Sequence, residues 1–256
     1  MFLRMGKRAL RLLVPLLALL VLGADSPSVE WESTARWKTG LVKPVMAVDT
    51  GTSLDVEELC QYPELPNGCE ATSLAAVLRF LGYDVTAPEL VYGYIPSEPI
   101  IYSEDGMLAY GPDPAEAYAG WPEEGYTGFY CFAGPIVQAA NQYLAEQNSG
   151  WRAADITGAS ALDLMRRLDE GTPMIVWATL NMDTRLFSSF HWTLPSGEEY
   201  YPFSNLHCMV LTGYEGDTFT LMDPIEGTVT VDREQFMSRY WTIGERAVAR
   251  VPKEGE

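Results

Sequence analysis

The sequence predicts an α+β fold in which helices come first and an antiparallel sheet follows. In the first part of the chain, apolar residues recur at the three- and four-residue spacing of amphipathic helices. In the last part, short apolar or alternating runs are separated by turn residues, which predicts consecutive strands. The chain has 256 residues, of which 47% are hydrophobic, so it is long enough and apolar enough to bury a core. We expect one folded domain over residues 54–252.

The N-terminal segment, residues 1–24, predicts an export signal. An uncharged run of 13 residues at 12–24 follows four basic residues, Arg4, Lys7, Arg8 and Arg11. A spanning helix needs about 20 apolar residues, so this run is too short to cross a membrane by itself and favours a signal peptide. An uncleaved N-terminal anchor is the alternative. We expect a secreted or cell-surface protein, with residues 25–53 as a linker or extended lead-in.

The charge and the composition restrict the classes of partner and cofactor that we expect. Without residues 1–24 the chain has 13 Lys and Arg against 35 Asp and Glu, a net charge of −22. A field of that sign repels nucleic acid and anionic membranes, and it favours basic or neutral partners. The favoured interpretation, however, is a solvated acidic surface that keeps an exported protein soluble, so the charge alone decides only which partners to exclude. No CxxC or HExxH spacing is present and the two histidines are isolated, so we expect neither a metal nor another cofactor.

The most informative stretch is Leu65–Gly82, which reads LPNGCEATSLAAVLRFLG. A turn leads directly into Cys69, and the residues after it predict a helix with one apolar face, made by Leu74, Val77, Leu78 and Leu81. Gly82 is a suitable helix end. Cys69 would therefore sit at the first helical turn, where unpaired N–H groups and the positive end of the helix dipole favour a thiolate over a thiol.

The remaining elements follow in order along the chain. Helices are predicted at residues 87–93, 134–147, 160–170 and from 233 to about 240, with Thr86, Ser160 and Asp232 as expected N-caps. Strands are predicted at residues 173–182, 206–214, 218–224, 227–232 and 247–251, with a short strand or turn at 54–60. Residues 94–131 and 183–205 are rich in aromatic and turn residues, and we expect them to be long loops of the kind that often serve function.

A nucleophilic cysteine needs a base, and His207 is the better placed of the two histidines. It lies in a predicted strand, and Asp223 ends the next strand, so a hairpin would bring the carboxylate alongside the imidazole. Such a carboxylate fixes the ring tautomer and stabilises the imidazolium. Gln61 lies eight residues before Cys69, so its amide could donate to an oxyanion together with the Cys69 N–H.

These residues also have structural interpretations. His207 could be a hydrogen-bonded core histidine, and Asp223 before a proline could open an ordinary turn. His191 competes as the base, although it lies in a predicted loop and no strand ending in an acid follows it. Gln61 taken alone carries little information.

The four cysteines allow a further alternative, because an even count outside the cytoplasm favours disulfides. Cys60 and Cys131 could pair and leave Cys69 free, but Cys69 could itself be half of a disulfide. Cys208 follows His207 on a strand, so its side chain should point away from the histidine and into the core.

Three segments together carry a resemblance to a known family. QYPELPNGCEATSLAAVLRFLGY, followed downstream by NLHCMVLTGYEG and LMDP, resembles the papain-type cysteine peptidases related to bacteriocin-processing (double-glycine leader) peptidases. FYCFAGPIVQAANQYL and GTPMIVWATLNM are similar to their stand-alone, exported branch in Gram-positive bacteria. The resemblance covers about residues 54–250 and implies a papain-like fold, with the nucleophile helix packed on an antiparallel sheet. It also implies site roles: Cys69 as nucleophile, His207 as base, Asp223 as orienting acid and Gln61 as oxyanion donor.

Two features depart from that family. Glu70 follows the nucleophile where many relatives have glycine, and a carboxylate beside the thiol would raise its pKa or narrow access to it. No transporter domain is present in the sequence, so leader-peptide processing coupled to export is not expected.

We therefore expect an exported cysteine peptidase, or a related amide hydrolase, that acts on a peptide or protein substrate without a cofactor. The alternative is a papain-fold module with little turnover, in which residues 94–131 and 183–205 bind a peptide or a cell-wall polymer. Acyl transfer at the same thiol is a third hypothesis.

Overall fold

The computed structural model describes residues 51–253. The predicted signal peptide at residues 1–24 and nearly all of the predicted lead-in, residues 25–53, lie outside this range. Among the described residues, no helix combines the length and the apolar character that crossing a membrane requires.

A seven-stranded sheet forms the centre of the described domain, in the order β12-β11-β10-β7-β13-β6, with β1 paired to β10. All neighbouring strands in it run antiparallel. Its strands are β1 (Thr52–Ser53), β6 (Trp151–Asp155), β7 (Met174–Thr179), β10 (Leu206–Glu215), β11 (Thr218–Asp223), β12 (Gly227–Asp232) and β13 (Ala247–Pro252). The antiparallel sheet of the predicted α+β fold is thus confirmed.

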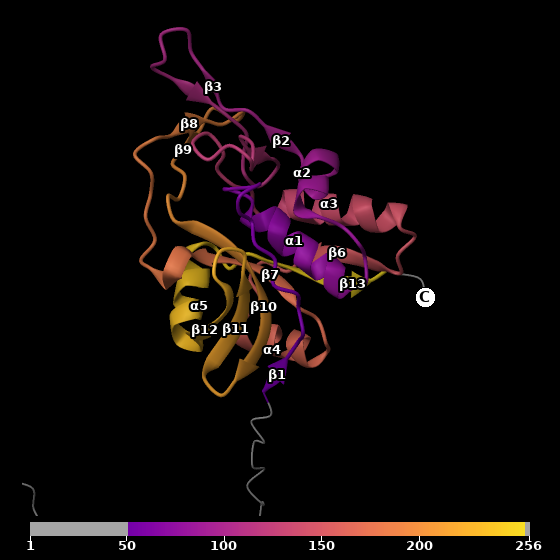
Figure 1. Ribbon diagram of the computed structural model, residues 1–256. Coiled ribbons are helices and arrows are strands. Elements are labelled where there is room, and N and C mark those ends of the chain that lie inside the picture. Colours follow the sequence, from indigo (N-terminus) through magenta and orange to yellow (C-terminus); the bar gives the residue numbers. More distant parts are fainter. Residues whose placement is uncertain (1–50, 254–256) are drawn as a thin grey trace, which may run out of the picture. The chain divides into compact units, whose positions relative to one another are not determined.

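Within residues 51–253, five α-helices accompany the sheet: α1 (Cys69–Phe80), α2 (Ala87–Gly93), α3 (Ala133–Glu146), α4 (Ala161–Asp169) and α5 (Arg233–Thr242). Helix α1 lies across β10 and β7 (Figure 1). Because side chains alternate along a strand, the sheet has an apolar core on each face. On one face Cys208, Val210 and Trp177 pack with the buried side chains of α1 and α3. On the other, Met209, Leu211 and Val176 pack with those of α4 and α5.

The predicted helix starts are confirmed. Thr86 and Ser160 each form a capping box with the acid three residues on, and the Asp232 side chain accepts a hydrogen bond from the Gln235 N–H. Helix α1 differs, since its N-cap is Gly68, which has no side chain to offer. A Cβ at that position would lie 2.4 Å from the Cβ of buried Leu65, so the turn before Cys69 requires glycine.

The two predicted loops contain short strands that pair with each other. Residues 94–131 provide β2 (Ser97–Glu98), β3 (Ile101–Tyr102), β4 (Ala109–Tyr110) and β5 (Tyr118–Ala119), and residues 183–205 provide β8 (Trp192–Thr193) and β9 (Glu199–Tyr200). Strands β3-β4-β8-β9 form a four-stranded sheet, here called the small sheet, and β2 pairs with β5. The small sheet lies above the N-terminal end of α1 in Figure 1. Sequence reasoning missed it because each strand has only two residues.

Other boundaries also differ from the prediction. The strand predicted at residues 173–182 ends at Thr179 and continues as a 3-10 turn, Leu180–Met182. No strand forms at residues 54–60, whereas β1 falls within the predicted lead-in. Strand β6 was not predicted because Ala153 is its one buried residue, so its sequence shows no apolar pattern. It also interrupts the predicted order by placing a strand between α3 and α4.

Candidate active site

Cys69 is the first residue of α1, which is the position that the sequence predicts. Its side chain is buried, and its Sγ lies 3.3 Å from the Glu70 Oε2, to which the thiol donates. The site therefore has a cysteine at a helix N-terminus, one of the positions at which reactive thiols are found, but with a carboxylate as its hydrogen-bond partner.

His207 and Asp223 form the second part of the site. Strands β10 and β11 are a hairpin, and their pairing places the start of β10 beside the end of β11. The His207 Nε2 lies 2.7 Å from the Asp223 Oδ1, with both side chains buried. The backbone N–H groups of Ile225 and Glu226 also donate to Oδ1, at 2.7 and 3.4 Å. The turn after β11 therefore fixes the carboxylate, which in turn fixes the imidazole ring.

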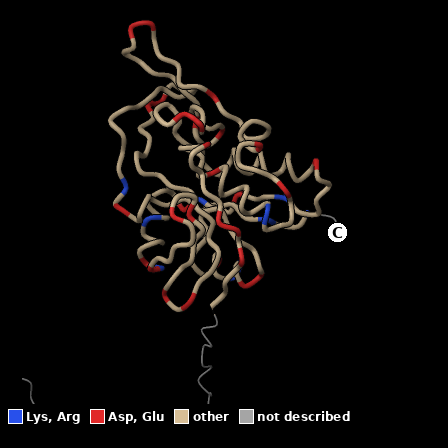
Figure 2. Tube along the Cα trace, viewed as in Figure 1, with Lys and Arg blue, Asp and Glu red and all other residues tan. Residues whose placement is uncertain are grey.

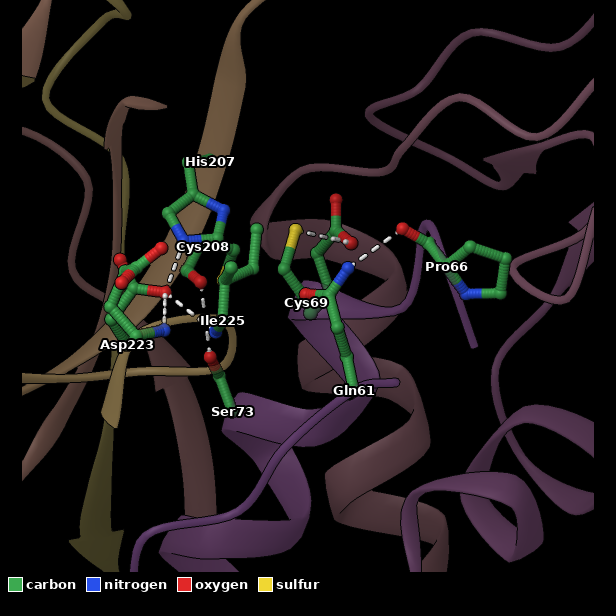
Figure 3. Close-up of polar contacts among 10 residues, drawn as sticks. Gln61, Pro66, Cys69, Ser73, His207, Cys208, Asp223 and Ile225 are labelled. Carbon is green, nitrogen blue, oxygen red and sulfur yellow. Dashed lines mark hydrogen bonds and ion pairs between the residues drawn. The ribbon is translucent and has the colours of Figure 1, made fainter. Parts of the chain in front are cut away.

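The charge of Asp223 is stabilised by these contacts. Burial alone would raise the pKa of its carboxyl, but the hydrogen bond and charge of His207 and the two N–H donors outweigh burial. The pKa of Asp223 is consequently held below its ordinary value. Because Nε2 is hydrogen-bonded to Asp223, the other ring nitrogen, Nδ1, lies on the side of the ring that faces Cys69 (Figure 3).

Gln61 joins the same site from the segment before α1. Its Nε2 donates to the Pro66 carbonyl oxygen at 2.7 Å, and the amide lies beside Cys69 in Figure 3. Its backbone N–H donates to the carbonyl oxygen of Pro224, the residue after Asp223, at 2.9 Å. The structure thus brings Gln61, Cys69, His207 and Asp223 together.

Cys208 connects the two halves of the site through its backbone. Its side chain is fully buried in the core against α1, as predicted. Its carbonyl oxygen accepts a hydrogen bond from the Ser73 Oγ at 3.3 Å. Because Ser73 lies one turn after Cys69 and Cys208 follows His207, this contact ties the nucleophile helix to the histidine strand (Figure 3).

The electrostatic setting of Cys69 is the reverse of the one expected from its place at a helix start. Burial raises the pKa of its thiol well above the ordinary value, and the negative charge of Glu70 raises it further. The favourable effect expected of the helix N-terminus on the thiolate is therefore outweighed by burial and by the charge of Glu70. The predicted effect of Glu70, a carboxylate that raises the pKa of the neighbouring thiol, is thus confirmed in direction.

Glu70 is itself fully buried. Its Oε1 accepts a hydrogen bond from the Cys131 backbone N–H at 3.1 Å, while Oε2 faces the thiol of Cys69. Burial raises the pKa of Glu70 to about 7. The contact with Cys131 could not be predicted, since the two residues lie 61 positions apart.

The competing base, His191, lies elsewhere. Its exposed ring is 3.1 Å from a Glu199 carboxylate oxygen and stacks on Tyr201 with ring centroids 4.7 Å apart. Both partners belong to the same segment, residues 183–205. His207, not His191, is therefore the histidine beside Cys69.

The four cysteines are all free thiols, Cys60 exposed and the other three buried. Neither the Cys60–Cys131 pairing nor a disulfide at Cys69 is present. Within residues 51–253, no cluster of three or more His, Cys, Asp or Glu side chains could hold a metal ion.

Comparison with known proteins places the chain among peptidase-like sequences. A model of the Peptidase_C39 like family matches residues 53–248, a range that includes all four site residues. The chain is 33% identical over 187 residues to the uncharacterized protein YvpB of Bacillus subtilis (strain 168), covering 73% of this chain and 70% of that protein. A crystal structure of a candidate C39-like peptidase from Bacillus anthracis matches with a TM-score of 0.68 and 27% identity, covering 80% of this chain and 99% of that one.

Proposed function

This chain belongs to the Peptidase_C39 like family, as the sequence resemblance predicted, and we propose that it is a cysteine peptidase with Cys69 as its nucleophile. The observation that carries the proposal is the buried His207–Asp223 pair, joined at 2.7 Å, whose free ring nitrogen is presented to Cys69. A carboxylate that holds Nε2 fixes the tautomer in which Nδ1 can accept a proton.

In the proposed reaction, His207 Nδ1 takes the proton of the Cys69 thiol, and Sγ attacks the carbonyl carbon of a peptide bond. Asp223 stabilises the imidazolium that forms. His207 then gives the proton to the departing amine, which leaves an acyl group on the sulfur. Water attacks this thioester with His207 as the base, so the peptide acid is released and the thiol is restored.

The oxyanion that forms during attack needs donors at the nucleophile end of the site. The backbone N–H of Cys69 is one, because the first N–H groups of a helix have no partner within it. We assign the second to Gln61. One of its two amide N–H groups donates to the Pro66 oxygen, and the other is available for the oxyanion.

The expected substrate is a basic or neutral peptide or protein. No Lys or Arg occurs between Arg79 and Arg152. The charged residues in the small sheet and in the turns of its two hairpins are all acidic: Glu104, Asp105, Glu198 and Glu199 (Figure 2). A surface of that sign attracts cationic chains and repels nucleic acid and anionic lipid headgroups. We also propose that the protein acts outside the cytoplasm, because residues 1–24 have the basic and apolar pattern of an export signal. The mass of the mature N-terminus in the culture medium tests that proposal.

One observation favours the alternative of a binding module with little turnover. Cys69 is buried and its pKa is raised, which keeps the sulfur protonated and weakly nucleophilic. The two hypotheses differ in one result, the release of new peptide termini.

The test is digestion of a mixed peptide library with identification of new termini by mass spectrometry. Cys69→Ala and His207→Ala should each lower the rate of cleavage by at least about 10³-fold. His191→Ala is the matched control, since it removes the other, exposed histidine, and should retain the wild-type rate. Peptides that bind without being cut would reject the peptidase and favour the binding module.

A further inference from the structure

Glu70 occupies an unusual place for a carboxylate, because it is buried against the atom that we propose as nucleophile. Its Oε2 lies 3.3 Å from the Cys69 Sγ, and its Oε1 is held by the Cys131 N–H at 3.1 Å. The side chain has no exposed surface. These two contacts and full burial hold the carboxyl group against the sulfur, so its protonation state directly affects the thiol.

Among the residues that the structure describes, the groups around Glu70 carry no compensating positive charge. None of the described residues forms an ion pair with it. The titratable groups that face it are thiols and phenols, from the segment before α3, from β5 and from β10: Cys131, Tyr130, Tyr118 and Cys208. Burial raises the pKa of each of these four groups, so all remain neutral at pH 5–8. The remaining ionisable groups near Cys69 are His207 and Asp223, which bond to each other at 2.7 Å.

A thiolate and a carboxylate 3.3 Å apart in a buried site repel each other strongly. The proposed attack therefore conflicts with a charged Glu70. If the carboxyl is protonated, the contact reverses its direction, since the O–H now donates to the sulfur and stabilises the thiolate.

We propose that Glu70 is a proton switch on the nucleophile: protonated, it donates to the Cys69 thiolate, and charged, it holds Cys69 as a thiol. This inference rests on the proposed function of Cys69 and His207. The competent site then carries two protons, one on Glu70 and one on His207, with the sulfur negative. When Glu70 releases its proton to solvent, the proton on His207 returns to the sulfur. The site is left with a thiol, a neutral imidazole and a carboxylate, which cannot begin the reaction.

The experiment measures the rate at which iodoacetamide alkylates Cys69 between pH 5 and pH 9, resolved by peptide mass spectrometry. Alkylation reports the thiolate without requiring a substrate. Cys60 is exposed and is followed in the same samples as a reference thiol. The variants are Glu70→Gln, which keeps the shape and the donor but loses the charge, and His207→Ala. Glu234→Gln, an exposed acid on α5, is the matched control.

In the wild type, we expect Cys69 alkylation to fall as the pH rises through about 7, where Glu70 loses its proton. Glu70→Gln should abolish that fall and label about tenfold faster than the wild type at pH 8, where about nine-tenths of Glu70 is charged. Glu234→Gln should follow the wild type.

Wild-type alkylation that rises steadily with pH would overturn the switch, and this result needs no variant to fold. A Glu70→Gln profile identical to the wild type would overturn it as well. In both cases, loss of Cys69 labelling in His207→Ala would still support the proposed catalytic pair. If His207→Ala labels as the wild type does at every pH, the proposed function fails together with the switch.

Discussion

The Ser73 hydroxyl donates to the carbonyl oxygen of Cys208 at 3.3 Å, and both residues are fully buried. This contact joins the helix that carries Cys69 to the strand that carries His207. The proposed chemistry depends on the alignment of those two elements, because proton transfer requires the sulfur and the ring nitrogen at hydrogen-bond distance.

Ser73→Ala tests this alignment. Loss of a single buried hydrogen bond should lower the free energy of unfolding by about 1 kcal/mol. We expect kcat/KM to fall by about tenfold, because a small misplacement of a nucleophile is costly. Urea unfolding and peptide hydrolysis are measured on the same preparation. Unchanged hydrolysis with reduced stability would show that Ser73 serves the fold and not the alignment.

Asp223→Asn should impair catalysis more than its small change in shape suggests. The asparagine keeps the size of the side chain but cannot stabilise an imidazolium by charge, and it can donate to Nε2 and so favour the wrong tautomer. We expect kcat to fall by at least about 100-fold. The control is Asp217→Asn, at the exposed turn of the same β-hairpin, which should retain wild-type activity. Equal losses in the two variants would contradict a specific role for Asp223.

Gln61→Glu separates the oxyanion role from binding. The change keeps the length of the side chain and removes its N–H donors, so the transition state loses stabilisation that the bound substrate does not use. We expect kcat to fall by about 10²- to 10³-fold with KM little changed. Gln142→Glu, on the exposed face of α3, is the matched control. A rise in KM at constant kcat would instead make Gln61 a substrate-binding residue.

Much of this site follows from local sequence patterns. The turn before Cys69 and the helix after it are encoded within one short stretch, and the β10–β11 hairpin alone brings Asp223 to His207. The same pattern distinguishes the two candidate bases, because His191 lies in a predicted loop and no strand that ends in an acid follows it. These predictions need no long-range information.

The rest depends on contacts between distant residues. The Glu70–Cys131 hydrogen bond joins residues that are 61 positions apart, and the Ser73–Cys208 hydrogen bond joins residues that are 135 positions apart. The small sheet likewise needs two separate segments to meet. The pKa of Cys69 likewise cannot be predicted from local sequence. The start of the helix favours a thiolate, but burial raises the pKa of the thiol by more, and burial is a property of the whole fold.

The final prediction concerns stability against pH, and its sign follows from Glu70. Burial raises the pKa of this carboxyl from an ordinary 4.5 to about 7, so the folded state binds the proton more tightly than the unfolded state. The stability due to this proton is fully present below pH 4.5 and is lost as the pH rises to about 7. At 1.36 kcal/mol per pKa unit, the loss between pH 5 and pH 8 is about 2.5 kcal/mol.

Glu70→Gln has no such proton to lose. The free energy of unfolding of the wild type minus that of the variant should therefore fall by about 2.5 kcal/mol between pH 5 and pH 8. Every other titrating group, including the His207–Asp223 pair, is present in both the wild type and the variant. The contributions of these groups to the free energy of unfolding therefore cancel in this difference. Urea unfolding at pH 5, 6, 7 and 8 measures it, and Glu234→Gln gives the baseline for an exposed carboxylate. A difference that stays constant with pH would mean that Glu70 is charged throughout the folded state between pH 5 and pH 8, and it would contradict the raised pKa that the switch requires.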